Sequence, residues 1–360
     1  MKLKKLVLKQ DQNNVKSIQQ LKDTACKQLV ETLAVTFNLE DCLEDFKSLK
    51  ENSTYNYINS TNDQDQNIIK DIQLCSNLVS VSLLFSQYSI QLLQKNWLKQ
   101  FLEAFNKCKK LTKIAISILS QFVSYSSVRS LGNLLSIQDS LQDIYIDFQN
   151  LNLKNEHLKG ITAGLMKLKH IKIITLDLSH NFISNEGAFL LGKSISKCLS
   201  LRKLTIYLEY NHLTENGIES ILEGVFQCNN LDHLDMDIGS NKEITLSTLK
   251  SFKSGLINLI NLKYLSFVYD SNMVNNNTIE NMCTNLTELK HLLHIKIDLD
   301  NNYIFYEGLK HLLDQLYGCK NLRTIYLLLR NNSFEFQKSI TKQTNRLLKL
   351  KKLVLFHLDY

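Results

Sequence analysis

The sequence predicts an α/β repeat fold, a solenoid in which one strand and one helix alternate along the chain. Two observations predict it. The pattern LxxLxLxLxxNxL recurs about every thirty residues, and the stretches between its copies carry apolar residues three and four positions apart. A sustained period of this length is typical of solenoids, in which each unit buries its apolar face against its neighbours.

The strand part of the unit is clearest in LDHLDMDIGSN, residues 231–241. Leu234, Met236 and Ile238 alternate with aspartates, and side chains two apart on a strand point to the same face. We therefore expect the apolar residues to face the core and the acids to face the opposite side of the sheet.

Further copies of this pattern run through the chain, and together they make about twelve units. Close copies begin at Ile171, Leu201, Leu292 and Leu322, looser copies at Leu78, Leu111, Leu141 and Leu262, a final copy at Leu350, and weaker strands at Leu3 and Val30. The sequence thus predicts one solenoid over residues 1–360, interrupted by an Asn-, Gln- and Ser-rich insertion at about 51–67 that we expect to be a surface loop.

Helices are predicted between the strands, for instance GIESILEGVFQC at 217–228 and GLKHLLDQLYGC at 308–319. Their apolar spacing is that of amphipathic helices. A glycine falls six residues after the Asn of its unit at Gly187, Gly217 and Gly308, where the missing side chain would let the chain turn tightly into the helix.

A further helix is expected at residues 92–105, LLQKNWLKQFLEAF. Leu93, Trp97, Phe101 and Phe105 lie four apart and so share one face. The single Trp is therefore predicted to be a core residue rather than a ligand contact.

These motifs resemble the leucine-rich repeat family, specifically its ribonuclease-inhibitor-like branch. The resemblance implies a horseshoe with a parallel sheet on the concave face and helices on the convex face. One feature differs, because the extra xL pair before the Asn in LTIYLEYN implies strands about two residues longer. The family serves many unrelated binding roles, so the resemblance predicts a fold and not a partner.

The repeat also accounts for residues that would otherwise suggest chemistry. By resemblance, the recurring Asn forms a buried ladder that satisfies loop backbone groups; its members are Asn181, Asn211, Asn241, Asn272, Asn302 and Asn332. Five cysteines precede the first Leu of a unit by three residues, a packing position; they are Cys75, Cys108, Cys198, Cys228 and Cys319. We assign only packing to the others, Cys26, Cys42 and Cys283.

Catalytic and metal-binding signatures are missing from the sequence. It contains no CxxC pair, no phosphate-binding GxxxxGK[ST], no HExxH and no GxSxG. The sequence therefore predicts no catalytic residue, no metal and no cofactor, and disulfides are not expected in a cytosolic chain.

Composition places the protein in the cytoplasm. The chain has no apolar run of about eighteen residues, and the apolar stretch in MKLKKLVLKQ is too short for a signal peptide. The net charge of +7 is modest and spread along the chain, so it indicates nucleic acid only weakly. We expect neither nucleic acid nor a membrane as partner.

The ends of the chain lack the polar caps that solenoids need. Leu353, Leu355, Phe356 and Leu358 belong to the last strand pattern and have nothing after them to cover them. Three alternatives stay open: a partner or a second copy packs end to end on them, the chain is the repeat region of a longer, multidomain product, or the last strand is simply exposed.

Acidic residues gather on the predicted concave face of the middle repeats. One column holds Asp147, Asp177, Tyr207, Asp237, Val268 and Asp298, the next holds Ser179, Glu209, Gly239, Asp270, Asp300 and Arg330, and Asp143 and Asp235 add to them. Neighbouring strands lie about 4.8 Å apart, so such columns stack like charges.

The leading hypothesis is a non-enzymatic module that binds a basic protein segment on this acidic face. The binding residues would be Asp147, Asp177, Tyr207, Glu209, Asp235, Asp237, Asp270, Asp298 and Asp300, with Tyr264 and Tyr326 as further aromatic anchors. Against it stands a merely solvated face. A resemblance to Ran GTPase-activating proteins suggests a regulatory alternative, although no arginine matches that family's functional positions.

Overall fold

A computed structural model describes residues 6–8, 32–37, 73, 78–85, 97–118, 123–241, 250–333 and 344–360. The chain divides into two compact units, Met1–Ile171 and Lys172–Tyr360, and each is described by itself. None of the helices in the described part combines the length and apolarity that crossing a bilayer requires.

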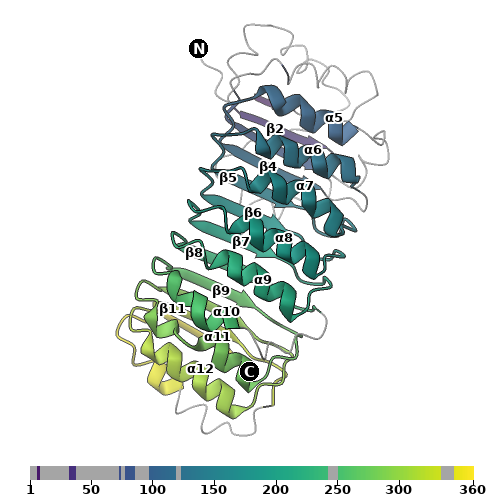
Figure 1. Cartoon of the computed structure of the whole chain (residues 1–360). Helices are drawn as coiled ribbons and strands as arrows, with labels where there is room; N and C mark the ends of the chain where they lie inside the picture. Colours follow the sequence, from purple (N-terminus) through teal and green to yellow (C-terminus); the bar gives the residue numbers. More distant parts are fainter. Residues whose placement is uncertain are drawn as a thin grey trace. The chain divides into compact units, whose positions relative to one another are not determined.

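Unit 1 is a run of parallel strands with helices between them. It contains β1 (Leu6–Leu8), β2 (Thr32–Phe37), β3 (Ser80–Phe85), α5 (Trp97–Ala104), the 3-10 helix η3 (Phe105–Lys107), β4 (Lys113–Ile118), α6 (Tyr125–Ser136), β5 (Asp143–Asp147) and α7 (Asn155–Leu165). Each strand pairs in parallel with the next in sequence, and the helices lie on one side of the strands (Figure 1).

Unit 2 repeats the same arrangement. It contains β6 (Ile173–Asp177), α8 (Asn185–Ile195), β7 (Lys203–Tyr207), α9 (Glu215–Val225), β8 (His233–Asp237), α10 (Lys250–Gly255), η4 (Leu256–Asn258), β9 (Tyr264–Val268), α11 (Asn276–Cys283), η5 (Leu286–Glu288), β10 (His294–Asp298), α12 (Tyr306–Gly318), β11 (Thr324–Leu328) and β12 (Leu355–Asp359). Its strands are again parallel and in sequence order. The described part of the chain thus holds twelve strands, at the twelve predicted places.

The core of unit 2 lies between the sheet and its helices. Leu234, Met236 and Ile238 of the predicted strand are at most 1% exposed, and Ile218 and Ile221 of α9 are fully buried. Burying each such side chain stabilises the fold by about 1.5–3 kcal/mol. The predicted alternation of core-facing and outward-facing residues is confirmed.

The asparagine ladder is confirmed as well. Asn211 donates from Nδ2 to the carbonyl oxygens of Leu178 (2.9 Å) and Leu208 (3.1 Å), and its Oδ1 accepts from the Ile183 backbone N–H (2.9 Å). Each amide therefore joins its own turn to that of the preceding unit, which satisfies backbone groups that water does not reach. Equivalent bonds are made by Asn241, Asn272, Asn302 and Asn332.

Strand pairing continues past the five-residue strands, as the extra xL pair predicts. The Leu208 backbone N–H donates to Asp237 O (2.7 Å), and the Tyr210 N–H donates to Gly239 O (3.2 Å). The same two bonds recur between the later pairs of units. Each of these strands therefore presents one further outward-facing position beyond its five residues. In the repeat that contains β7, this position holds Glu209.

The repeated glycine acts through the space it leaves at the start of the helix and not through an unusual backbone conformation. In the described residues no glycine has a positive φ, so Gly217 and Gly308 do not allow an unusual turn into the helix. A Cβ at Gly217 would lie 2.5 Å from Asn185 Oδ1, and one at Gly308 would lie 2.5 Å from Asn276 Oδ1. Each Asn side chain instead accepts a backbone N–H at the start of the next helix, that of Thr214 (2.9 Å) in the first case.

The helix boundaries shift slightly from the predicted ones. α9 and α12 each begin two residues before the predicted glycine, and the described part of the helix predicted at 92–105 is α5 followed by η3. Phe101 and Phe105 are fully buried, as predicted. Leu93 and the side chain of Trp97 lie outside the described residues, as does the insertion at 51–67.

The cysteines of the described part are free and buried, which confirms their packing role. Burial raises the pKa of Cys198, Cys228 and Cys319 to about 12, so these thiols stay protonated at neutral pH. Cys283 is buried in the same way. Cys26, Cys42 and Cys75 lie outside the described residues.

The last strand of unit 2 is its least covered one. β12 pairs with β11, and around it Val354 is 83% exposed and Leu355 is 53% exposed. The end-to-end contact suggested by the sequence stays a prediction.

Candidate functional site

The outward residues of β6–β10 form the face of unit 2 that carries no helix. The predicted column is in register there, because Tyr207 pairs with Asp237, Asp237 with Val268, and Val268 with Asp298. We call this surface the acidic face; its acids are Asp177, Glu209, Asp235, Asp237, Asp270, Asp298 and Asp300. Asp147, at the end of β5, holds the equivalent position in unit 1.

The aspartates that end β6, β8 and β10 have a local structural role. Asp237 Oδ1 accepts the backbone N–H of Gly239 (2.9 Å), Asp177 that of Ser179 (3.1 Å) and Asp298 that of Asp300 (3.2 Å). A carboxylate that binds an N–H two residues on stabilises a turn. The sequence interpretation missed this role, although the recurrence of Asp two residues before a small or acidic residue would have indicated it.

Gly239 brings two carboxylates of adjacent strands together. A side chain at this position would overlap Asp270 Oδ1 and would lie 3.3 Å from Asp237 Oδ1. The Asp270 carboxylate therefore covers Gly239 and lies beside Asp237. A residue larger than glycine would push these two acids apart.

The crowded acids hold their protons more tightly than usual. The pKa of Asp237 is raised to about 7, mainly by burial and also by the charges of Glu209 and Asp270, against the opposing effects of the Gly239 N–H and Lys296. Burial is also the main cause that raises the pKa of Glu209, Asp270 and Asp298. Each of these groups also feels at least one neighbouring carboxylate, so the acids of this face repel one another.

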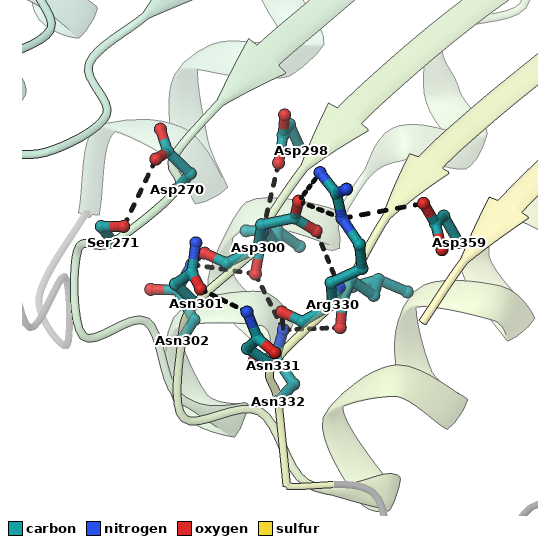
Figure 2. Close-up of polar contacts among 12 residues, drawn as sticks. Asp270, Ser271, Asp298, Asp300, Asn301, Asn302, Arg330, Asn331, Asn332 and Asp359 are labelled. Carbon is teal, nitrogen blue, oxygen red and sulfur yellow. Dashed lines mark hydrogen bonds and ion pairs between the residues drawn. The ribbon is translucent and has the colours of Figure 1, made fainter.

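Arg330 compensates the acids at one end of the face (Figure 2). Its Nε donates to Asp300 Oδ2 (2.7 Å), its backbone N–H donates to Asp300 Oδ1 (2.7 Å), and its Nε lies 3.7 Å from Asp359 Oδ2. Asp300 is only 6% exposed. The Asp300 carboxylate is therefore largely enclosed and bonded to Arg330, and its contact with a partner stays a prediction.

Two other predicted residues are bonded to each other. The Tyr207 hydroxyl donates to Asp235 Oδ2 (3.0 Å), and burial together with the Asp235 charge raises the pKa of Tyr207 above its usual value. In unit 1, Asp147 Oδ2 accepts from the Ser117 hydroxyl (2.8 Å), and Lys113 Nζ lies 3.0 Å from Asp143 Oδ2. The Lys113–Asp143 ion pair compensates one of these two carboxylates in unit 1.

Rings accompany the acids on the same strands. The rings of His233 and Tyr264 stack with centroids 4.1 Å apart, and those of Tyr326 and His357 stack at 4.2 Å. Tyr326 is 37% exposed. The two predicted aromatic anchors are thus already stacked on histidines of neighbouring strands.

Sequence reasoning missed a second group of rings, in the turns that follow β6 and β7. His180 stacks on Tyr210 (4.3 Å between centroids), and Phe182 lies 5.6 Å from His212. Phe182 is 46% exposed and Tyr210 is 53% exposed. The signal that could have revealed them was His180 and Tyr210 at a turn position that later repeats give to Ser or Asn, each followed two residues later by another ring.

Nowhere in the described residues do three or more His, Cys, Asp or Glu side chains lie in an arrangement that could hold a metal ion. The acids of this face are spread along neighbouring strands rather than turned toward a common point. The arrangement is suited to contact with a large, positively charged surface.

The sequence matches no family model and no curated protein. Solved structures similar to it include one from the yeast complex of Rad7 and Elc1, with 15% identity and a TM-score of 0.49 over 81% of this chain and 66% of that chain. Another is internalin C2 from Listeria monocytogenes str. 4b F2365, with 17% identity and a TM-score of 0.33 over 72% of this chain and 74% of that chain.

The chain has a leucine-rich repeat fold. Its parallel strands, the helices that cover one side of them and the asparagine ladder in the turns are the features of this fold.

Proposed function

We propose that the chain is a non-enzymatic protein-interaction module and that its acidic face binds a basic segment of another protein. The observation that carries the proposal is the crowding of carboxylates on adjacent strands: Asp237 and Asp270 meet around Gly239, and the charges of Glu209 and Asp270 act on Asp237 while that of Asp270 acts on Asp298. Lys296 is the cation that lowers the pKa of Asp237 and Asp298.

Charge complementarity defines the partner. Lys or Arg side chains placed over these carboxylates would remove the mutual repulsion that the free face contains, and they would lower the raised pKa values. Nucleic acid and anionic lipid would be repelled by these carboxylates and would raise their pKa values further. Binding of a basic segment should therefore release protons near neutral pH.

Further properties belong to the same proposal. We assign the fold to the ribonuclease-inhibitor-like branch, because strand registers advance by 30 or 31 residues and α8, α9 and α12 are full helices of 11, 11 and 13 residues. The protein acts in the cytoplasm as one continuous solenoid. The buried free thiols of its described part are consistent with a reducing compartment.

The test is binding of a fluorescent oligo-lysine peptide by the double variant Asp237→Asn, Asp298→Asn. Asn keeps an oxygen that accepts the backbone N–H two residues on, so the turns are preserved while two charges are removed. We expect a loss of affinity of about tenfold, which shrinks as salt screens the charges.

The matched control is the double variant Asp139→Asn, Glu223→Gln, which removes two exposed carboxylates that lie off the acidic face. It should bind the peptide as the unaltered chain does. Equal losses in both variants would mean that overall charge rather than this face governs binding, and the proposal would fail.

A further inference from the structure

The turns after β6 and β7 expose four rings at one edge of the acidic face. His180 and Tyr210 stack with an angle of 13° between their planes, and Phe182 and His212 form a second, tilted pair. Tyr210 keeps 53% of its surface exposed although one face of its ring is stacked. A stacked ring with a free outer surface can accept a further planar group.

Tyr210 lies in an unusual backbone conformation for its residue type. Its φ is 50°, in the left-handed region that bulky residues seldom occupy. The same turn position holds Ser240, Ser271, Asn301 and Asn331 in the later units, also at positive φ. The positive φ belongs to this turn in each of these repeats, His180 (φ 54°) included, and Tyr210 differs from the later ones in carrying an exposed ring that stacks on His180.

The stacked pair lies directly beside the carboxylates. His180 Nε2 is 3.8 Å from Glu209 Oε1, and the pKa of Glu209 is raised by burial and by the charges of Asp177 and Asp270. In the next repeat, the positions equivalent to Glu209 and Tyr210 hold Gly239 and Ser240. The row of rings formed by His180 and Tyr210 therefore ends at Tyr210. A ring face and a carboxylate thus meet at one place.

Arginine is the side chain that fits both features. Its guanidinium is planar and delocalised, so it can stack on a ring while its N–H groups bond to a carboxylate. A lysine ammonium is a compact, strongly hydrated charge that cannot stack in this way. The combination of Glu209 with Tyr210 therefore distinguishes between two partners of equal charge.

We propose that the stacked pair His180–Tyr210, together with Glu209, binds an arginine side chain of the basic partner segment, so that the protein selects arginine-rich over lysine-rich partners. This inference rests on the proposed function, because it concerns the partner of the same face. It adds a position at which the identity of the basic residue matters, whereas the acids alone respond only to charge.

The experiment compares oligo-arginine and oligo-lysine peptides of equal length by fluorescence anisotropy, with the full chain and three variants. Tyr210→Ser removes the ring but keeps a residue type that adopts the same backbone at Ser240 and Ser271. Tyr210→Phe keeps the ring. Tyr303→Ser removes a tyrosine of similar exposure, 54%, from the turn after β10.

The unaltered chain should bind oligo-arginine about 3- to 10-fold more tightly than oligo-lysine. Tyr210→Ser should lose most of this preference by weakening oligo-arginine binding alone, while Tyr210→Phe and Tyr303→Ser should retain it. A preference that is absent from the unaltered chain, or that survives in Tyr210→Ser, overturns the inference.

The two proposals fail in distinguishable ways. If both peptides bind equally and the Asp237→Asn, Asp298→Asn variant still loses affinity, the acidic face binds basic segments but the rings do not select arginine. If neither peptide binds to the unaltered chain, the proposed function and the arginine preference are both wrong.

Discussion

At the scale of single residues, Asp237 serves two purposes that conflict. Its Oδ1 accepts the Gly239 N–H and so holds the turn after β8. Burial and neighbouring acids nevertheless raise its pKa to about 7, so the charged form that most carboxylates adopt at neutral pH is costly here. A residue that serves only the fold would do better as Asn, which accepts the same bond without a charge.

This conflict predicts how stability depends on pH. Because the folded-state pKa is higher than the ordinary value of 3.8, folding binds a proton between these two pH values. The stability contributed by Asp237 is fully present below about pH 4 and is lost as the pH rises through about 7. Asp237→Asn should therefore be more stable than the unaltered chain at pH 8, by about 1–2 kcal/mol, and the difference should shrink toward pH 4.

Urea denaturation at several pH values measures this difference. The exposed carboxylate of Asp139, replaced by Asn, serves as the control and should change stability little at any pH. A difference between Asp237→Asn and the unaltered chain that does not vary with pH would mean that the Asp237 pKa is not raised.

Residue by residue, the sequence predicted positions better than interactions. The burial of Met236, the Asn211 bonds and the packing of Cys228 follow from a repeated pattern, because one unit reports on all the others. The enclosure of Asp300 by Arg330 depends on the path of one long side chain, and no periodic pattern encodes that path. The His180–Tyr210 stack occurs in a single pair of units and was missed for the same reason.

At the scale of elements, close approach between helices explains two further glycines, Gly192 in α8 and Gly224 in α9. A methyl group at Gly224 in α9 would overlap the carbonyl oxygen of Gly192 in α8, and one at Gly192 would overlap the carbonyl oxygen of Ser220. The two helices can approach this closely only because neither residue has a side chain. Sequence spacing showed that glycine recurs, but the reason required the distance between neighbouring helices.

Gly224→Ala tests this explanation. Alanine favours a helix by about 1 kcal/mol over glycine, so an isolated helix would gain from the change. Because the methyl group meets backbone rather than a movable side chain, we expect the protein to lose about 1–3 kcal/mol instead.

Thermal or urea unfolding measures the loss, with Asn216→Ala as the control, since it adds alanine to an exposed position of the same helix. The control should be neutral or slightly stabilising. If Gly224→Ala proves equally harmless, α8 and α9 do not pack at the distance described.

At the scale of the whole molecule, the distribution of charge matters more than its sum. The chain carries a formal net charge of +7, yet the helix-free face of unit 2 gathers acids that repel one another. A basic protein with one acidic face can orient a basic partner on that face and repel it elsewhere. The fold itself does not require this arrangement, because Val268 fills one position of the acid column without a charge.

Carboxylate footprinting tests the acidic face most directly. The full chain is treated with a carbodiimide and a small amine, with and without oligo-arginine, and the modified residues are quantified by mass spectrometry. We predict that the peptide protects Glu209, Asp237, Asp270 and Asp298 and leaves Asp139 and Glu223 as reactive as before. Protection of Asp139 and Glu223 with unchanged labelling of the four acids would contradict the assignment of binding to this face.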